Sequence, residues 1–145
     1  MKRASGKPSA EAIRRAEEGL AEEHRALGQL VGRLASVEAL SELVPLLDEL
    51  HPKLHSHFAH EEYPGGLYDT LGATASTYRD QVRELVDDHF RILAKVRELR
   101  GRAGEGDPET AAALIGEARA IIPWLQRHEG REHAIAEQAH RAIEP

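Results

Sequence analysis

The chain has 145 residues, which is enough for one domain with a buried core. Hydrophobic residues make up 41% of it, charged residues 30%, and the net charge is −6 with histidine neutral. This acidic balance argues against binding to nucleic acid or to an anionic membrane, because both call for a basic surface. Cysteine is absent, which excludes disulfides, thiolate metal sites and cysteine nucleophiles.

The first eight residues are basic but contain no apolar stretch, so they are not typical of a secretory signal. We expect residues 1–8 to be a disordered tail and residues 9–145 to form a single domain. No apolar run reaches the roughly 18 residues that a membrane helix needs. A cytoplasmic protein without a membrane partner is therefore expected.

The composition favours helices throughout, because alanine, leucine, glutamate and arginine are abundant and β-branched and aromatic residues are few. Apolar residues recur every three to four positions in four segments, at about residues 9–34, 36–63, 76–100 and 107–139. Residues 64–75 are expected to be a loop. Short connections between amphipathic helices predict an all-α fold, an antiparallel up-down-up-down four-helix bundle.

Capping residues and prolines mark the expected helix ends and bends. Ser9 is a plausible N-cap of the first helix, and Asp107, followed by a proline, is a plausible N-cap of the fourth. Pro52 and Pro123 fall inside the second and fourth segments, where a proline removes a hydrogen bond and clashes with the preceding turn. We expect a kink at each.

Nine histidines are many for this length, and every one of the four apolar stripes contains at least one. In the second and fourth segments a glutamate follows the histidine four residues later, so the imidazole and the carboxylate lie on one helical face. The first and third segments each add one imidazole. The six polar residues predicted to converge inside the bundle are His24, His57, Glu61, His89, His128 and Glu132.

Two carboxylates inside a bundle need compensation. Burying an unpaired carboxylate costs several kcal/mol, and two close together repel each other. No lysine or arginine lies on these stripes, whereas metal ions would neutralise both charges. Nitrogen and oxygen ligands suit non-haem iron or manganese, and imidazole also suits zinc and copper. The alternative is a metal-free bundle whose six polar residues hydrogen-bond to one another and to water.

The remaining histidines and two acidic residues have lesser expected roles. His60 precedes Glu61 and could hydrogen-bond a site residue. Glu23 and Asp88 each precede an inward histidine and point about 100° away from it, so we expect them to orient an imidazole only weakly. The histidines off the stripes, expected to be exposed, are His51, His55, His133 and His140.

The order of these motifs resembles the hemerythrin-like family, also called HHE cation-binding domains. The resemblance rests on the stretch His57-Phe58-Ala59-His60-Glu61-Glu62, on the lone His24 and His89, and on His128-Glu129-Gly130-Arg131-Glu132. It covers about residues 10–140.

The resemblance implies a site of two non-haem iron ions with an oxo or hydroxo bridge, held by the six inward residues. It implies that Glu61 and Glu132 are the bridging carboxylates. Manganese or zinc in place of iron stays open.

Two departures separate the chain from the oxygen-carrying hemerythrins. Those proteins have two histidines four apart on the third helix, whereas here Leu85 and Leu93 stand at that distance from His89. Their last carboxylate is an aspartate five residues after the histidine, whereas Glu132 follows His128 by four. This arrangement is similar to bacterial and iron-sensing relatives with four histidines and two glutamates. A missing imidazole opens a coordination position that favours reaction with O₂, peroxide or nitric oxide.

The sequence is compatible with three functions. The first is a di-iron protein that binds O₂, peroxide or nitric oxide, either reversibly or with peroxidase or catalase-like turnover. The second is an O₂ or iron sensing or storage protein without turnover. The third is a metal-free structural bundle. The sequence does not decide whether the chain is an enzyme, and it identifies no catalytic residue. The oligomeric state is expected to be either a monomer or a weak dimer.

Overall fold

The computed structural model describes residues 9–143, which form seven α-helices and, within that range, no strand. The all-α prediction is confirmed. The expected disordered tail, residues 1–8, lies outside the described residues, so the predicted domain boundaries stay predictions. The helices are α1 (Ala10–Gly19), α2 (Ala21–Ala35), α3 (Leu40–Glu62), α4 (Leu67–Gly72), α5 (Ser76–Gly104), α6 (Ala111–Arg119) and α7 (Ile121–Ile143).

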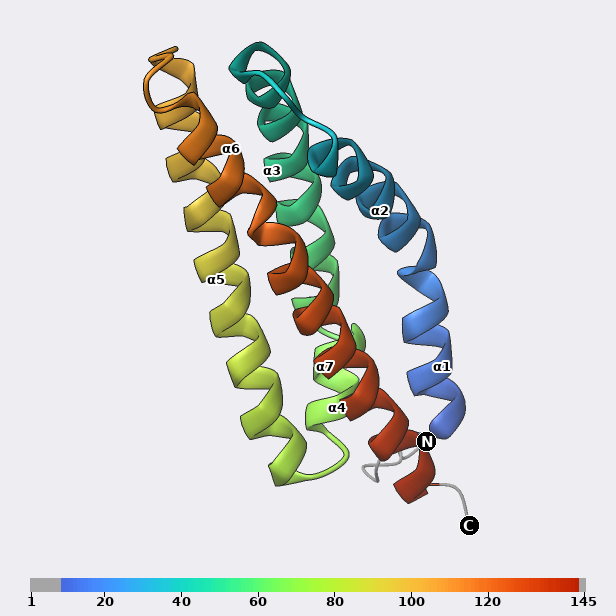
Figure 1. Ribbon diagram of the computed structural model, residues 1–145. Coiled ribbons are helices and arrows are strands. Elements are labelled where there is room, and N and C mark those ends of the chain that lie inside the picture. Colours follow the sequence, from blue (N-terminus) through green and yellow to red (C-terminus); the bar gives the residue numbers. More distant parts are fainter. Residues whose placement is uncertain (1–8, 144–145) are drawn as a thin grey trace.

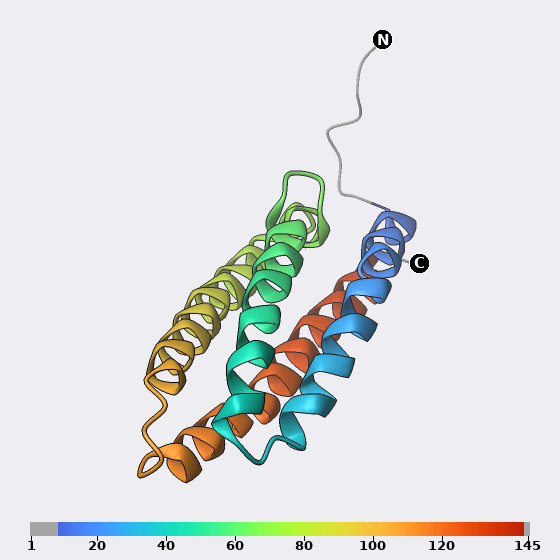
Figure 2. The same cartoon turned by 90° about the horizontal axis from the view of Figure 1, so that it is seen from above.

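The long helices pack side by side into a bundle with a shared interior (Figures 1 and 2). α3 packs against α2 and α5, and α7 packs against α1 and α5. None of the described helices has a stretch long and apolar enough to cross a membrane.

The first predicted helix is divided into α1 and α2 at Leu20. Its start agrees with expectation, because the Ser9 hydroxyl accepts a hydrogen bond from the Ala12 N–H at 3.1 Å. The Leu20 N–H bonds to the Glu17 carbonyl at 3.1 Å, three residues back instead of four. Gly19, a weak helix former, precedes this break.

The fourth predicted helix begins later than expected and is also divided. Asp107 is not its N-cap, because α6 begins at Ala111 and the Asp107 side chain accepts from the Glu109 N–H within a preceding turn. The division between α6 and α7 falls at Ala120, three residues before Pro123. Because proline lacks an N–H and crowds the carbonyl four residues earlier, the expected bend becomes a break. At Pro52, by contrast, α3 continues without interruption.

Residues 64–75, expected to be a loop, contain the short helix α4. Its residues Leu67, Tyr68 and Leu71 are buried. α4 contacts α1, α3, α5 and α7, and it lies at the lower end of the bundle in Figure 1. The expected loop is thus part of the core.

The apolar core consists of two clusters that leave a polar layer between them. On α5, Leu85 belongs to one cluster and Ile92 to the other, with His89 between them. On α7, Leu125 and Ile135 flank His128 in the same way. The inward histidines therefore occupy a polar layer that crosses the bundle.

Candidate metal centre

The polar layer contains the residues that the apolar stripes predicted to point inward. Five of them are at most 4% exposed, and His24 is half-buried. Each of these residues lies about one helical turn from a core residue of its own helix. Because the apolar stripe of that helix packs in the core, the polar residue on the same face is also buried. The five are His57, Glu61, His89, His128 and Glu132.

Their donor atoms form two groups, within each of which every atom lies within 4.8 Å of the others. Glu61 belongs to both. Its Oε2 lies 3.3 Å from the His57 Nε2, and its Oε1 lies 3.2 Å from the His89 Nε2. One carboxylate therefore presents one oxygen to each group. The three-donor group is His24, His57 and Glu61, and the four-donor group is Glu61, His89, His128 and Glu132.

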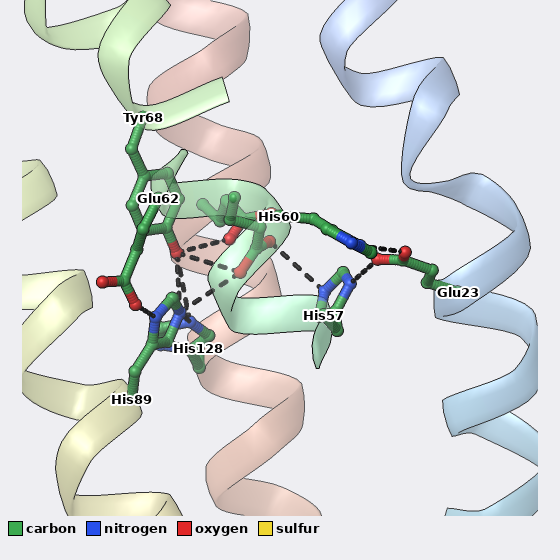
Figure 3. Close-up of polar contacts among 9 residues, drawn as sticks. Glu23, His57, His60, Glu62, Tyr68, His89 and His128 are labelled. Carbon is green, nitrogen blue, oxygen red and sulfur yellow. Dashed lines mark hydrogen bonds and ion pairs between the residues drawn. The ribbon is translucent and has the colours of Figure 1, made fainter. Parts of the chain in front are cut away.

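A residue that was not predicted lies inside the four-donor group. The Tyr68 hydroxyl on α4 is 2.7 Å from the Glu132 Oε2 and 2.9 Å from the His89 Nε2. It is also 3.4 Å from the His128 Nε2 and 3.4 Å from the Glu61 Oε1. Figure 3 shows this phenol oxygen directed at the two imidazoles. The Tyr68 oxygen is therefore a fifth potential donor atom in this group.

Each of three buried imidazoles is oriented by a carboxylate from the preceding long helix. An ionised carboxylate only accepts hydrogen bonds, so the ring Nδ1–H donates and the Nε2 lone pair faces the interior. Outer carboxylates of this kind hold metal-binding histidines in place. The pairs, measured from Nδ1 to carboxylate oxygen, are His57 with Glu23 at 2.8 Å, His89 with Glu62 at 2.6 Å, and His128 with Asp88 at 3.2 Å.

Glu23 and Asp88 were expected to have a weak orienting effect. Each instead makes a direct hydrogen bond, and each reaches across to an imidazole on another helix rather than to its own neighbour in sequence. Glu62 was named only as part of the stretch from His57 to Glu62, and no orienting role was predicted for it. His60 bonds Glu23 and not a residue of the two donor groups, so it supports the site through that carboxylate.

The remaining histidines follow the prediction only in part. His55 and His133 are exposed as expected, but His51 and His140 are half-buried. The His140 Nε2 accepts from the Arg14 guanidinium at 2.9 Å, which joins α7 to α1. These four side chains take no part in either donor group.

The imidazoles of the four-donor group face each other in a way that calls for a cation. The Nε2 atoms of His89 and His128 are 3.0 Å apart. Because both rings donate through Nδ1, both Nε2 atoms carry lone pairs and share no proton. Protonation of His89 does not relieve this, since burial, followed by the nearby His128 and His57, lowers the pKa of His89 to about 2. A metal ion between the two lone pairs would relieve it.

The carboxylates and the remaining imidazole point to the same requirement. Burial raises the pKa of Glu61 to about 7 and holds the pKa of Glu132 well above its usual range. Cations would allow both to ionise. The His24 Nε2 is buried without a hydrogen-bond partner in the described part of the chain. Buried polar atoms are almost always paired, so this atom is a further sign that the donor set fits metal ions.

The fold and this donor set define a helical domain suited to binding metal cations. The chain belongs to the hemerythrin HHE cation-binding family, because residues 15–138 match the model described as "Hemerythrin HHE cation binding domain". The resemblance seen in the sequence is thereby confirmed, and with it metal binding as the general role of the domain. No curated protein and no solved structure matches the chain.

Proposed function

We propose that the chain is a non-haem di-iron protein that binds O₂ or a related small molecule, peroxide or nitric oxide. The observation that carries this proposal is the position of Glu61, which presents one carboxylate oxygen to each of two donor groups. A shared carboxylate suits two adjacent ions better than one. The donors are nitrogen and oxygen only, which suits iron; manganese or zinc would fit the same donors.

In this proposal each donor group holds one ion. His24, His57 and Glu61 hold the first, and Glu61, His89, His128 and Glu132 hold the second. Three protein ligands on the first ion leave positions for a small molecule.

Tyr68 would help to hold the second ion. The Tyr68 hydroxyl is between 2.7 and 3.4 Å from the donor atoms around it, which supports its use as a further oxygen ligand. The Tyr68 phenol would thus partly replace the second histidine that α5 lacks.

When bound, a pair of iron ions supplies electrons to O₂ or exchanges them with peroxide. The residues of the chain prepare that chemistry. The outer carboxylates Glu23, Glu62 and Asp88 keep the Nε2 lone pairs aimed inward. The apolar clusters pack against the layer on both sides and keep its surroundings largely apolar.

We also propose the antiparallel up-down-up-down arrangement, with α1 and α2 as one rod and α6 and α7 as another. The course of the ribbon in Figure 1 supports it. A cytoplasmic setting, with no nucleic-acid or membrane partner, fits the acidic composition.

The test is to mix the chemically reduced, iron-loaded protein with O₂ and follow its visible spectrum. A stable oxygenated species that releases O₂ under vacuum would indicate reversible binding. Rapid oxidation to the ferric form, followed by turnover of added peroxide, would indicate an enzyme. A spectrum that responds to none of O₂, peroxide and nitric oxide would contradict the proposal.

A further inference from the structure

A cavity of about 220 Å³ adjoins the three-donor group, between α2, α3 and α7. Its lining combines apolar side chains with six polar ones, which are His24, His57, Glu61, Gln126, His128 and Glu129. Figure 3 shows the His57 imidazole apart from those of His89 and His128, and of these three rings the His57 and His128 rings line the cavity. The apolar walls include Leu27 and Val31 from α2, Leu54 and Phe58 from α3, and Leu125 from α7.

The cavity is much larger than O₂, nitric oxide or hydrogen peroxide. A water molecule in the liquid occupies about 30 Å³, and an apolar cavity of about 150 Å³ accommodates benzene. A space of 220 Å³ therefore fits a molecule of benzene's size or slightly more. A diatomic ligand would leave most of the apolar wall uncovered.

The charges around the cavity restrict the chemistry of its occupant. In the metal-free protein Glu61 and Glu129 line the cavity and disfavour an anion. A cation would lose its hydration against the apolar walls. In the metal-free protein the buried His24 Nε2, without a partner, offers an acceptor to one hydroxyl group; with an ion held there, the hydroxyl would face that ion instead.

We propose that this cavity binds an uncharged organic molecule of six to ten non-hydrogen atoms that carries one hydroxyl group, with its apolar body between α2, α3 and α7 and its hydroxyl at His24 and His57. This deepens the proposed function, on which it rests, by naming the class of molecule that reaches the three-donor ion. Binding to the cavity itself does not require that ion.

Phenol and benzene are suitable probes, with binding measured by isothermal titration calorimetry on the metal-free and the iron-loaded full chain. Gly28 lies exposed at the rim of the cavity, and a Cβ added there meets no atom within 4 Å. Gly28→Leu should therefore extend over the mouth without disturbing α2. Gly32→Leu is the matched control, since Gly32 is equally open, one turn further along α2 and not part of the cavity wall.

Phenol should bind the wild type and Gly32→Leu alike, and at least tenfold more weakly to Gly28→Leu. Val31→Phe, which enlarges a wall residue, should weaken binding to a similar extent. Benzene, which lacks the hydroxyl, should bind the wild type at least fivefold more weakly than phenol. Absent binding to the wild type, equal binding by every variant, or benzene as tight as phenol would overturn the proposal.

Iron content, measured on the same samples, separates this proposal from the proposed function. Phenol binding that Gly28→Leu weakens, in a protein that takes up no iron, would leave the cavity assignment standing and defeat the di-iron proposal. Two irons per chain without phenol binding would do the reverse.

Discussion

Tyr68 places a phenol oxygen among the donor atoms of four other residues, on a helix of only six residues. The sequence did not predict this residue, because helical periodicity places only residues that share a face of one long helix. The six inward residues follow from the register of their own helices. Tyr68 reaches the site only because α4 folds back against α3, α5 and α7, which no periodicity in the chain records.

The first prediction concerns Tyr68→Phe, which removes the hydroxyl and keeps the ring. The ferric protein should retain its iron but lose a visible absorption band that arises from phenolate-to-iron charge transfer. Tyr63→Phe is the control, because Tyr63 is 55% exposed. Identical visible spectra for wild type and Tyr68→Phe would exclude Tyr68 as a ligand.

The outer carboxylates show a second limit of prediction from sequence. Glu23 and Asp88 were noticed because each precedes an inward histidine, but the partner of each lies on another helix. Glu62 directly follows the inward Glu61, and its partner His89 likewise lies on another helix. Contacts between helices depend on their relative rotation, which a single sequence does not state.

The second prediction follows from one of these contacts. Glu62→Ala frees the His89 Nδ1 and should weaken iron affinity roughly 10- to 100-fold, the usual effect of removing such a partner. Glu62→Gln, which keeps an acceptor, should recover part of the loss. Glu42→Ala, an exposed change on the same helix, should bind iron as the wild type does. Competition with a chelator measures all four proteins, and equal affinities would contradict the orienting role.

At the element scale, the long helices were predicted nearly to their ends because periodicity accumulates over many turns. The divisions at Leu20 and Ala120 arise at local weak points, a glycine and a proline, that favour a break without fixing its position. α4 spans only Leu67–Gly72, too few residues for periodicity to separate a buried helix from a loop.

The third prediction tests whether α4 positions Tyr68. Leu71 on α4 and Leu47 on α3 are both 0% exposed, but they belong to different core clusters. Changing either to alanine should lower the free energy of unfolding by about 2–5 kcal/mol, measured by denaturant titration. Only Leu71→Ala should also alter the Tyr68 absorption band. Equal spectra for the two variants would show that α4 packing does not hold Tyr68 in place.

At the scale of the whole molecule, the polar layer costs stability when no metal is bound. Burial raises the pKa of Glu61 from 4.5 to about 7, so the folded protein binds a proton that the unfolded chain has already released within that pH range. Stability then falls as pH rises, because the folded state holds more protons than the unfolded one.

The fourth prediction concerns how much stability the metal-free protein loses as the pH rises, and how iron changes that pH dependence. Each pKa unit is worth about 1.4 kcal/mol, so the metal-free protein should lose on the order of 3 kcal/mol of Glu61-linked stability between about pH 4.5 and 7. Glu61→Gln, measured metal-free, should remove most of that slope. Iron loading should reverse the slope, since metal binding favours deprotonated ligands. The same pH dependence of stability in the metal-free wild type and in metal-free Glu61→Gln would contradict the buried-carboxylate interpretation.

The fifth prediction is the iron content of the purified, iron-supplied protein, measured by elemental analysis, because it counts the ions directly. We expect two irons per chain in the wild type and in the exposed control His55→Ala. His24→Ala, which affects one donor group, should retain one ion. Glu61→Ala, which affects both, should lose most of both. Clearly less than one iron per wild-type chain, or undiminished iron in Glu61→Ala, would contradict a two-ion site built around Glu61.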